Sequence, residues 1–301
     1  MNIFTLSDVE YDKEMILRYG NKVIDNTLLL YDCELNTFNF VEQLDVWLVV
    51  IWHSNVSFQR SPANIVTLQA TDCEITQISG IRNMVQLYQL DLSNNLIVDI
   101  SELQYLVNVE ILDLNYNQIV SIDSLQSLCL LKTLNLNYNQ IVDCSSVRTL
   151  QNLESLSITN NYLVEIHDLR YLALNALSLH NNKIIDISPL INMVTLNHLQ
   201  LQFNCVQNIS VVQNHPNRIK YKCTEQTTPN PEQILLSYKL NNIKNQINRF
   251  GSVQIQWKKI QCKCKNIIEQ IKYNLNKIQI QNEKFLNLAI NILQQTYLCD
   301  Q

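Results

Sequence analysis

Two histidines and two cysteines are the side chains whose type and spacing first suggest a reactive or metal-binding site. His180 and His198 fall in neighbouring units of the repeat described below, about four residues out of step, which is roughly 13 Å at the rise of an extended chain. Cys262 and Cys264 form a C-x-C pair in a stretch with helical periodicity, where residues i and i+2 point in different directions. A closed zinc site needs further ligands at suitable spacing. We therefore predict no metal site and ordinary thiols.

Other catalytic signatures are missing from the sequence as well. It contains only three glycines, and it has neither a phosphate-binding loop nor a dinucleotide fingerprint. No nucleophile, base and orienting group stand in a recognisable arrangement. We therefore predict that the protein is not an enzyme and binds no cofactor.

A repeated sequence motif determines where the candidate functional side chains lie. LDLNYNQIVSI at 112–122 returns as LNLNYNQIVDC at 134–144, offset by 22 residues. The template L-x-x-L-x-L-x-x-N-x-L, with positions numbered one to eleven, fits seven successive segments. Their position-nine residues, here called anchors, are separated by 22, 22, 22, 22, 21 and 22 residues: Cys73, Asn95, Asn117, Asn139, Asn161, Asn182 and Asn204. Such a period indicates a stack of coils.

The physical reason for the repeat lies in its apolar positions. Leu90 and Leu92 alternate as in a short strand, so both point into a shared core. One coil cannot cover its own apolar face, so neighbouring coils must stack on it. The anchor amide both donates and accepts, and a column of such amides can satisfy backbone groups in the turns. Cys73 is small enough to replace asparagine there.

The pattern resembles the leucine-rich-repeat family, and specifically its 22-residue class, as in the leucine-rich-repeat regulatory subunit of protein phosphatase 1. DISPL at 186–190 is similar to the turn that opens the return segment in this class. The resemblance covers 65–209. It implies an α/β solenoid, a horseshoe with parallel strands on its concave face, whose outward residues contact protein partners.

Carboxylates and aromatic rings occupy several of these outward positions. A first group lies on three neighbouring coils: Tyr88, Asp91, Asp113, Tyr116 and Tyr138. A second group comprises His180, His198 and Phe203. Tyrosine gives a large contact area with few torsions to restrict, and the carboxylates favour a basic partner. The alternative is a merely soluble surface on which the tyrosines pack along the turns.

The segments before the array carry weaker signals. SDVE at 7–10 is a capping-box pattern and predicts a capping helix within 1–22. Two degenerate leading repeats are expected in 23–64, and in the second the pattern places Trp52 at the anchor.

The segments after the array change in composition. Three prolines mark a cap or linker at 210–231. Heptads then predict a helical tail over 232–301, with polar Asn282 at a core position. This tail either forms a coiled coil that joins chains into a homo-oligomer or folds back as an intrachain hairpin. Residues 1–231 carry 12 Lys or Arg and 23 Asp or Glu, whereas the tail carries 10 and 4.

Composition also restricts the choice of partner and compartment. The longest apolar run, LDVWLVVIW at 44–52, is far shorter than the roughly 20 residues of a membrane span, so we expect no membrane contact. An acidic array repels phosphate, so we do not expect nucleic acid. The first residues lack a signal-peptide pattern, which predicts a cytoplasmic or nuclear protein that is not secreted.

The leading functional hypothesis is a non-catalytic protein-interaction scaffold that binds a partner on the concave face. Two alternatives remain open. One is a regulatory subunit of a protein phosphatase or similar enzyme, and the other is a structural or cytoskeletal component that associates through the tail.

Overall fold

The computed structural model describes residues 4–6, 22–24, 26–31, 33–35, 41, 46–58, 61–215 and 220–222. The chain divides into two compact units, Met1–Ile234 and Leu235–Gln301. The second unit lies outside the described residues, and so does the stretch around 8–19 where we predicted a capping helix. The predictions for the tail therefore stay predictions.

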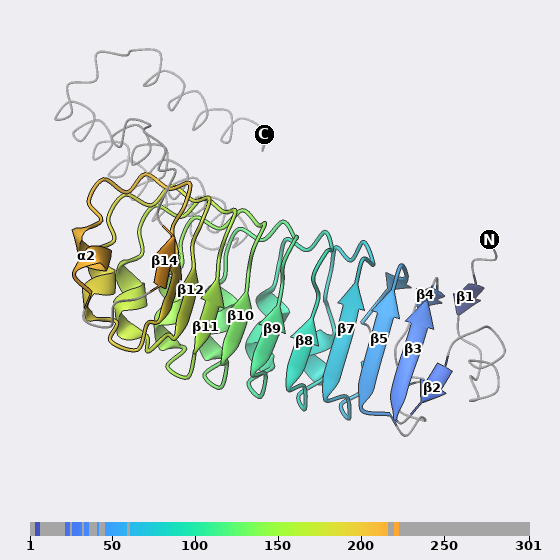
Figure 1. Ribbon diagram of the computed structural model, residues 1–301. Coiled ribbons are helices and arrows are strands. Elements are labelled where there is room, and N and C mark those ends of the chain that lie inside the picture. The colour runs from blue at the N-terminus through green and yellow to red at the C-terminus, as the bar shows by residue number, and fades with distance from the viewer. Residues whose placement is uncertain are drawn as a thin grey trace, which may run out of the picture. The chain divides into compact units, whose positions relative to one another are not determined.

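A continuous main sheet runs through the described part of the first unit, and its strands lie side by side in Figure 1. Every pairing between neighbouring strands is parallel except the first, where β2 is antiparallel to β3. In chain order the strands are β2 (Lys22–Ile24), β3 (Thr27–Tyr31), β5 (Leu48–Trp52), β7 (Thr67–Thr71), β8 (Gln89–Asp91), β9 (Ile111–Asp113), β10 (Thr133–Asn135), β11 (Ser155–Ser157), β12 (Ala176–Ser178), β13 (His198–Gln200) and β14 (Lys220–Lys222). The predicted solenoid with a row of parallel strands is confirmed.

A small second sheet accompanies the first few coils. It contains β1 (Phe4–Leu6), β4 (Cys33–Leu35) and β6 (Asn55–Val56) in the order β1-β4-β6, with both pairings parallel.

The leucines of the template lie in register across the strands. Leu90 pairs with Leu112, and Leu112 pairs with Leu134. The next inward residues continue the ladder beyond the strand ends, because Leu92 N–H donates to the Asp113 carbonyl and Leu114 N–H to the Asn135 carbonyl. All these leucine side chains are buried. Each coil therefore covers the apolar side of the next.

The return segments form short 3₁₀-helices behind the sheet (Figure 1). They are η2 (Ile81–Asn83), η3 (Ser101–Tyr105), η4 (Asp123–Ser127), η5 (Ser145–Thr149), η6 (His167–Tyr171) and η7 (Ser188–Asn192). Buried residues here recur every third position, as in Ile100, Leu103 and Leu106. A 3₁₀-helix has three residues per turn, so this spacing keeps all of them on one side.

The register of the second leading repeat differs from the prediction. Val49 pairs with Leu68 and Ile51 with Ala70, which puts Ser54, and not Trp52, at the anchor position. The Ser54 hydroxyl is buried and donates to the Trp52 carbonyl at 2.7 Å. A shift of two residues preserves the inward-outward alternation of a strand, so the apolar pattern alone fitted either register.

The sheet also continues past residue 209, where the sequence pattern fades. In the last coil the four-residue helix α2 (Ser210–Gln213) stands in the return segment, and β14 then pairs with β13. None of the helices in the described ranges offers the apolar length that a bilayer crossing requires.

Candidate functional site

The anchor residues form a continuous column of hydrogen bonds inside the array. Each of the six anchor asparagines is buried, and its Nδ2 donates to a backbone carbonyl of the preceding coil at 2.7–2.9 Å. At Asn139, Oδ1 also accepts Ile119 N–H at 3.0 Å, and Nδ2 reaches the Leu136 carbonyl of its own coil at 3.1 Å. The column ends at Cys73, whose thiol lies 3.6 Å from the Ile51 carbonyl. These residues hold the turns at the carboxyl ends of the strands.

Position eight, just before each anchor, has a left-handed backbone. In the seven regular coils this position has φ between 50° and 57°: Asp72, Asn94, Tyr116, Tyr138, Asn160, Asn181 and Phe203. Asparagine and aspartate tolerate this conformation better than other residues with a Cβ, whereas bulky side chains are uncommon there. The four Asn and Asp residues are therefore explained by the turn, and the three aromatic residues are not.

Two of these aromatic residues stack on each other. The rings of Tyr116 and Tyr138 have centroids 4.2 Å apart and planes 9° from parallel. Both side chains remain about half exposed, at 51% and 45%. A hydrogen bond with Tyr138 raises the pKa of the Tyr116 phenol above its ordinary value. The pair is therefore a preformed aromatic surface.

A network of carboxylate and amide groups lies beside the stack. Asp113 accepts Asn115 N–H at Oδ1 (2.9 Å), and its Oδ2 accepts the Asn135 amide at 3.0 Å. The network continues to the next coils, where the Asn137 side chain donates to Asn135 and accepts from Ser157 Oγ at 2.7 Å. These bonds fix the side chains of three neighbouring coils.

Asp91 lies opposite Asp113 in the sheet, so a second carboxylate adjoins this network. Burial is the main reason that the pKa of Asp113 lies above its ordinary value, and the Asp91 carboxylate raises it further, while hydrogen bonds from Asn115 and Asn135 oppose the rise. Two adjacent carboxylates repel each other, and no Lys or Arg in the described ranges forms an ion pair with either of them. A cationic group supplied from outside would remove this repulsion.

Replacement Asp113→Asn is expected to raise the free energy of unfolding at about pH 7. The native pKa lies above the unfolded one, so ionisation of Asp113 lowers stability as pH rises through this window, and the variant avoids that loss. An amide fits the position, since Asn135 occupies it in the next coil. Urea titrations of both proteins should show the gain at about pH 7 and little difference near pH 3. A gain of equal size at both pH values would contradict this assignment.

The remaining predicted site residues are not brought together with the stack. Tyr88 precedes β8, at the opposite end of the strands from Tyr116, about 20 Å away by strand rise. In the next two coils the same position carries Glu110 and Lys132, which form an ion pair at 2.6 Å. His198 lies on β13 opposite Ala176, whereas His180 follows the end of β12, so the two histidines do not converge. Among the described residues, no group of three His, Cys, Asp or Glu side chains could hold a metal ion.

Phe203 occupies position eight of the last predicted coil and is 46% exposed. It belongs to the same row as the tyrosine stack, with Asn160 and Asn181 between them, and the amide of Asn181 donates to Asn160 Oδ1 at 2.5 Å. The second predicted group therefore contributes one exposed ring to this row.

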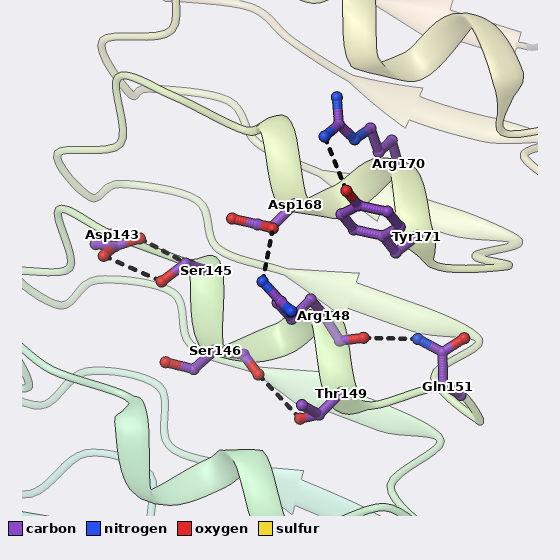
Figure 2. Close-up of polar contacts among 9 residues, drawn as sticks. All are labelled: Asp143, Ser145, Ser146, Arg148, Thr149, Gln151, Asp168, Arg170 and Tyr171. Carbon is purple, nitrogen blue, oxygen red and sulfur yellow. Dashed lines mark hydrogen bonds and ion pairs between the residues drawn. The ribbon is translucent and has the colours of Figure 1, made fainter.

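The helix side of the array has a different character. Its polar side chains bond to one another and to the backbone, as Figure 2 shows for η5 and η6. Arg148 lies 4.0 Å from Asp168, and Thr149 Oγ1 donates to the Gln126 carbonyl of the preceding coil at 2.8 Å. Two tyrosines are exposed there, Tyr105 at 48% and Tyr171 at 50%. They provide internal controls for the strand-side tyrosines.

Cys73, Cys129 and Cys144 are free thiols, and their reactivity should differ sharply. Burial raises the pKa of Cys73 to about 11 and that of Cys144 to about 12, whereas Cys129 is exposed. The thiolate is the reactive form. Brief alkylation at about pH 8, read by residue-resolved mass spectrometry, should therefore modify Cys129 and leave Cys73 and Cys144 intact until urea unfolds the protein. Equal alkylation of Cys144 and Cys129 in the native protein would contradict the packing.

Comparisons with known proteins agree with this architecture. Residues 107–147 match the family model described as Leucine Rich repeats (2 copies). No curated protein matches the chain. Among solved structures, internalin C2 of Listeria monocytogenes is similar, with a TM-score of 0.55 and 28% identity over 66% of this chain and 80% of that chain.

Two further structures share the fold. A second internalin of Listeria monocytogenes has a TM-score of 0.55 and 22% identity over 68% of this chain and 71% of its own. A leucine-rich-repeat protein of Leptospira interrogans has a TM-score of 0.58 and 24% identity over 67% of this chain and 55% of its own. The protein therefore has the fold of a repeat solenoid with a largely parallel sheet. Residues 107–147 carry leucine-rich repeats, and the array has the leucine-rich-repeat fold, which generally serves as a protein-interaction scaffold and is typically not enzymatic.

Proposed function

We propose that this protein is a non-catalytic scaffold that binds a protein partner on the concave, strand-bearing face of its array. The contact surface comprises Asp91, Asp113, Tyr116 and Tyr138, here called the tyrosine–aspartate patch. It lies on three neighbouring coils and includes the carboxyl ends of β8 and β9.

The single observation that carries this proposal is the exposed tyrosine stack on a left-handed backbone. A left-handed conformation costs most residues about 1–2 kcal/mol, and asparagine and aspartate are the residues with a Cβ that visit it most readily. Four other coils have Asn or Asp at this position, so the two tyrosines do not serve the turn. They do not serve the core either, because both rings are about half exposed. Tyrosine is enriched among residues that dominate binding energy at protein interfaces.

The surrounding polar groups support a protein partner as well. The amides and the Asp113 carboxylate are held by bonds of 2.6–3.0 Å to their neighbours, so ordering them costs the complex little additional entropy. The Asp91–Asp113 pair favours a partner with a cationic group at this place.

The test uses the full chain as bait in an extract of the cells that produce it, followed by affinity measurements with the recovered protein. The test variant carries Tyr116→Asn and Tyr138→Asn. Asparagine already occupies this position, with the same backbone conformation, at Asn94 and Asn160. Its stability should be unchanged or slightly raised. We expect the partner to bind it at least about tenfold more weakly than the wild type.

The matched control changes the equally exposed tyrosines of the helix side. The control carries Tyr105→Ser and Tyr171→Thr. Serine and threonine already occupy the equivalent position in other coils, at Ser127 and Thr149. This control should bind like the wild type. Equal affinity of all three proteins, or a loss confined to the control, would refute the proposal. Recovery of a phosphatase catalytic subunit as the patch-dependent partner would support the regulatory-subunit alternative.

A further inference from the structure

The two ends of the tyrosine stack have different electrostatic surroundings. In the row of position eight, Asn94 follows on the Tyr116 side, where its amide donates to Asp72, and Asp91 lies on the same coil as Asn94. On the Tyr138 side, Asn160 and Asn181 follow, and positions five and seven of those coils carry Ser157, Thr159, Ser178 and His180. At these positions of the described coils, carboxylates therefore flank the Tyr116 end of the stack and not the Tyr138 end.

The outer ring face at this end is partly open. One face of the Tyr116 ring is covered by Tyr138. Because Asn94 and Tyr138 stand on opposite sides of Tyr116 in the row, the other face lies on the Asn94 side. Backbone bonds place Asn94 directly beside Tyr116, since Asn95 N–H donates to the Tyr116 carbonyl at 3.0 Å. An asparagine side chain is shorter than a tyrosine ring, so the outer part of this ring face stands above the amide. The 51% exposure of Tyr116 agrees with that geometry.

The neighbouring carboxylates retain capacity to accept hydrogen bonds. Asp91 Oδ1 accepts Ser93 N–H at 2.9 Å, and no residue in the described ranges donates to its Oδ2. Asp72 receives the Asn94 amide at Oδ1. Asp72 and Tyr116 are two strand spacings apart, or about 10 Å, so one planar cation between them can reach the ring and a carboxylate together.

We propose that the Tyr116 end of the stack is the subsite for an arginine side chain of the partner. Its guanidinium lies flat on the outer face of the Tyr116 ring above Asn94, with Asp91 and Asp72 as counter-charges. This assignment rests on the proposed function and names the chemistry of the group that the patch recognises.

Guanidinium fits better than the other groups that stack on a tyrosine. It is planar, weakly hydrated and always charged, and it carries several N–H donors for a carboxylate. The protein itself provides an example, because the Arg170 guanidinium lies 4.9 Å from the centroid of the Tyr171 ring and donates to its hydroxyl at 2.8 Å (Figure 2). A lysine ammonium cannot stack as a plane, and the phosphates of a nucleotide would be repelled by Asp72 and Asp91.

The test is an array of matched peptide pairs that differ only in arginine or citrulline at the centre, probed with the full-length protein. Citrulline keeps the planar shape and removes the charge. We expect a subset of pairs to bind at least about tenfold better with arginine. Tyr116→Asn and Asp91→Asn should each abolish this preference, whereas Tyr171→Thr on the helix side should leave it intact. Asp91→Asn keeps the acceptor for Ser93 N–H, and Asn135 shows that an amide fits position five.

Equal binding of both peptide series, no arginine-dependent binding at all, or a preference that survives Tyr116→Asn would overturn the subsite. So would Tyr116-dependent binding of a single-stranded oligothymidine in place of the peptides. The broader proposal is tested separately with the recovered partner. If that partner requires the two tyrosines but binds Asp72→Asn and Asp91→Asn variants normally, the arginine subsite fails and the binding surface stands.

Discussion

Replacement of Asn139 by leucine is expected to lower the free energy of unfolding by about 1–3 kcal/mol. The amide accepts Ile119 N–H and donates to the carbonyls of Leu114 and Leu136, all inside the array. Leucine has a similar volume but leaves these backbone groups without partners, and an unpaired buried polar group loses its hydration without compensation. Urea unfolding followed by circular dichroism measures the difference.

Two further variants separate this effect from general disturbance. Gln140→Leu changes the next residue, whose side chain is exposed. Leucine already occupies the equivalent position in another coil, at Leu96, so the free energy of unfolding should hardly change. Asn139→Cys should fall between, because the Cys73 thiol lies within hydrogen-bonding reach of carbonyls but cannot replace the Oδ1 acceptor well. Equal stabilities of Asn139→Leu and Gln140→Leu would show that the amide column does not stabilise the array.

Replacement of Leu114 by alanine is expected to cost about 2–5 kcal/mol. Leu114 is fully buried and lies between Leu92 and Leu136 of the adjoining coils. Removal of its side chain leaves a cavity at the contact between neighbouring coils, and stability in a repeat array depends on such contacts. Thermal and urea unfolding of the full chain should both report the loss.

Leu130→Ala is the matched control for this change, because it removes the same atoms from a side chain that is 45% exposed. It should cost well under half as much as Leu114→Ala. Similar losses at the two positions would mean that burial between coils does not hold the array together.

The sequence predicted the buried framework because the same physical demand recurs in every coil. Leu90, Leu112 and Leu134 occupy equivalent positions at a constant spacing, and the structure pairs them in that register. The 3₁₀ form of the return segments is also visible in principle, since Ile100, Leu103 and Leu106 are three residues apart. The leading repeat was harder to place, because the interval from Ser54 to Cys73 is shorter than the regular 22 residues and a two-residue shift keeps the strand pattern.

The geometry of the candidate site was less accessible from sequence. Asparagine or aspartate at position eight, as in Asp72, Asn94, Asn160 and Asn181, indicates a left-handed backbone. The tyrosines at the same position in other coils obscure this pattern. The stacking of Tyr116 on Tyr138 follows once both are known to share that backbone conformation on adjacent coils. Tyr88 lies on a neighbouring coil but at the other end of the strand, and the repeat number alone does not show this difference. Residues that contact a partner are selected by another molecule and not by the packing of the coils, so they do not recur at the repeat spacing.

The most direct test of the account is hydroxyl-radical footprinting of tyrosine side chains in the full chain, with and without the recovered partner. Four tyrosines start from comparable exposure: Tyr116 at 51%, Tyr138 at 45%, Tyr105 at 48% and Tyr171 at 50%. We expect the partner to protect Tyr116 and Tyr138 from oxidation and to leave Tyr105 and Tyr171 unchanged. Protection of the helix-side tyrosines with full oxidation of Tyr116 and Tyr138 would contradict it.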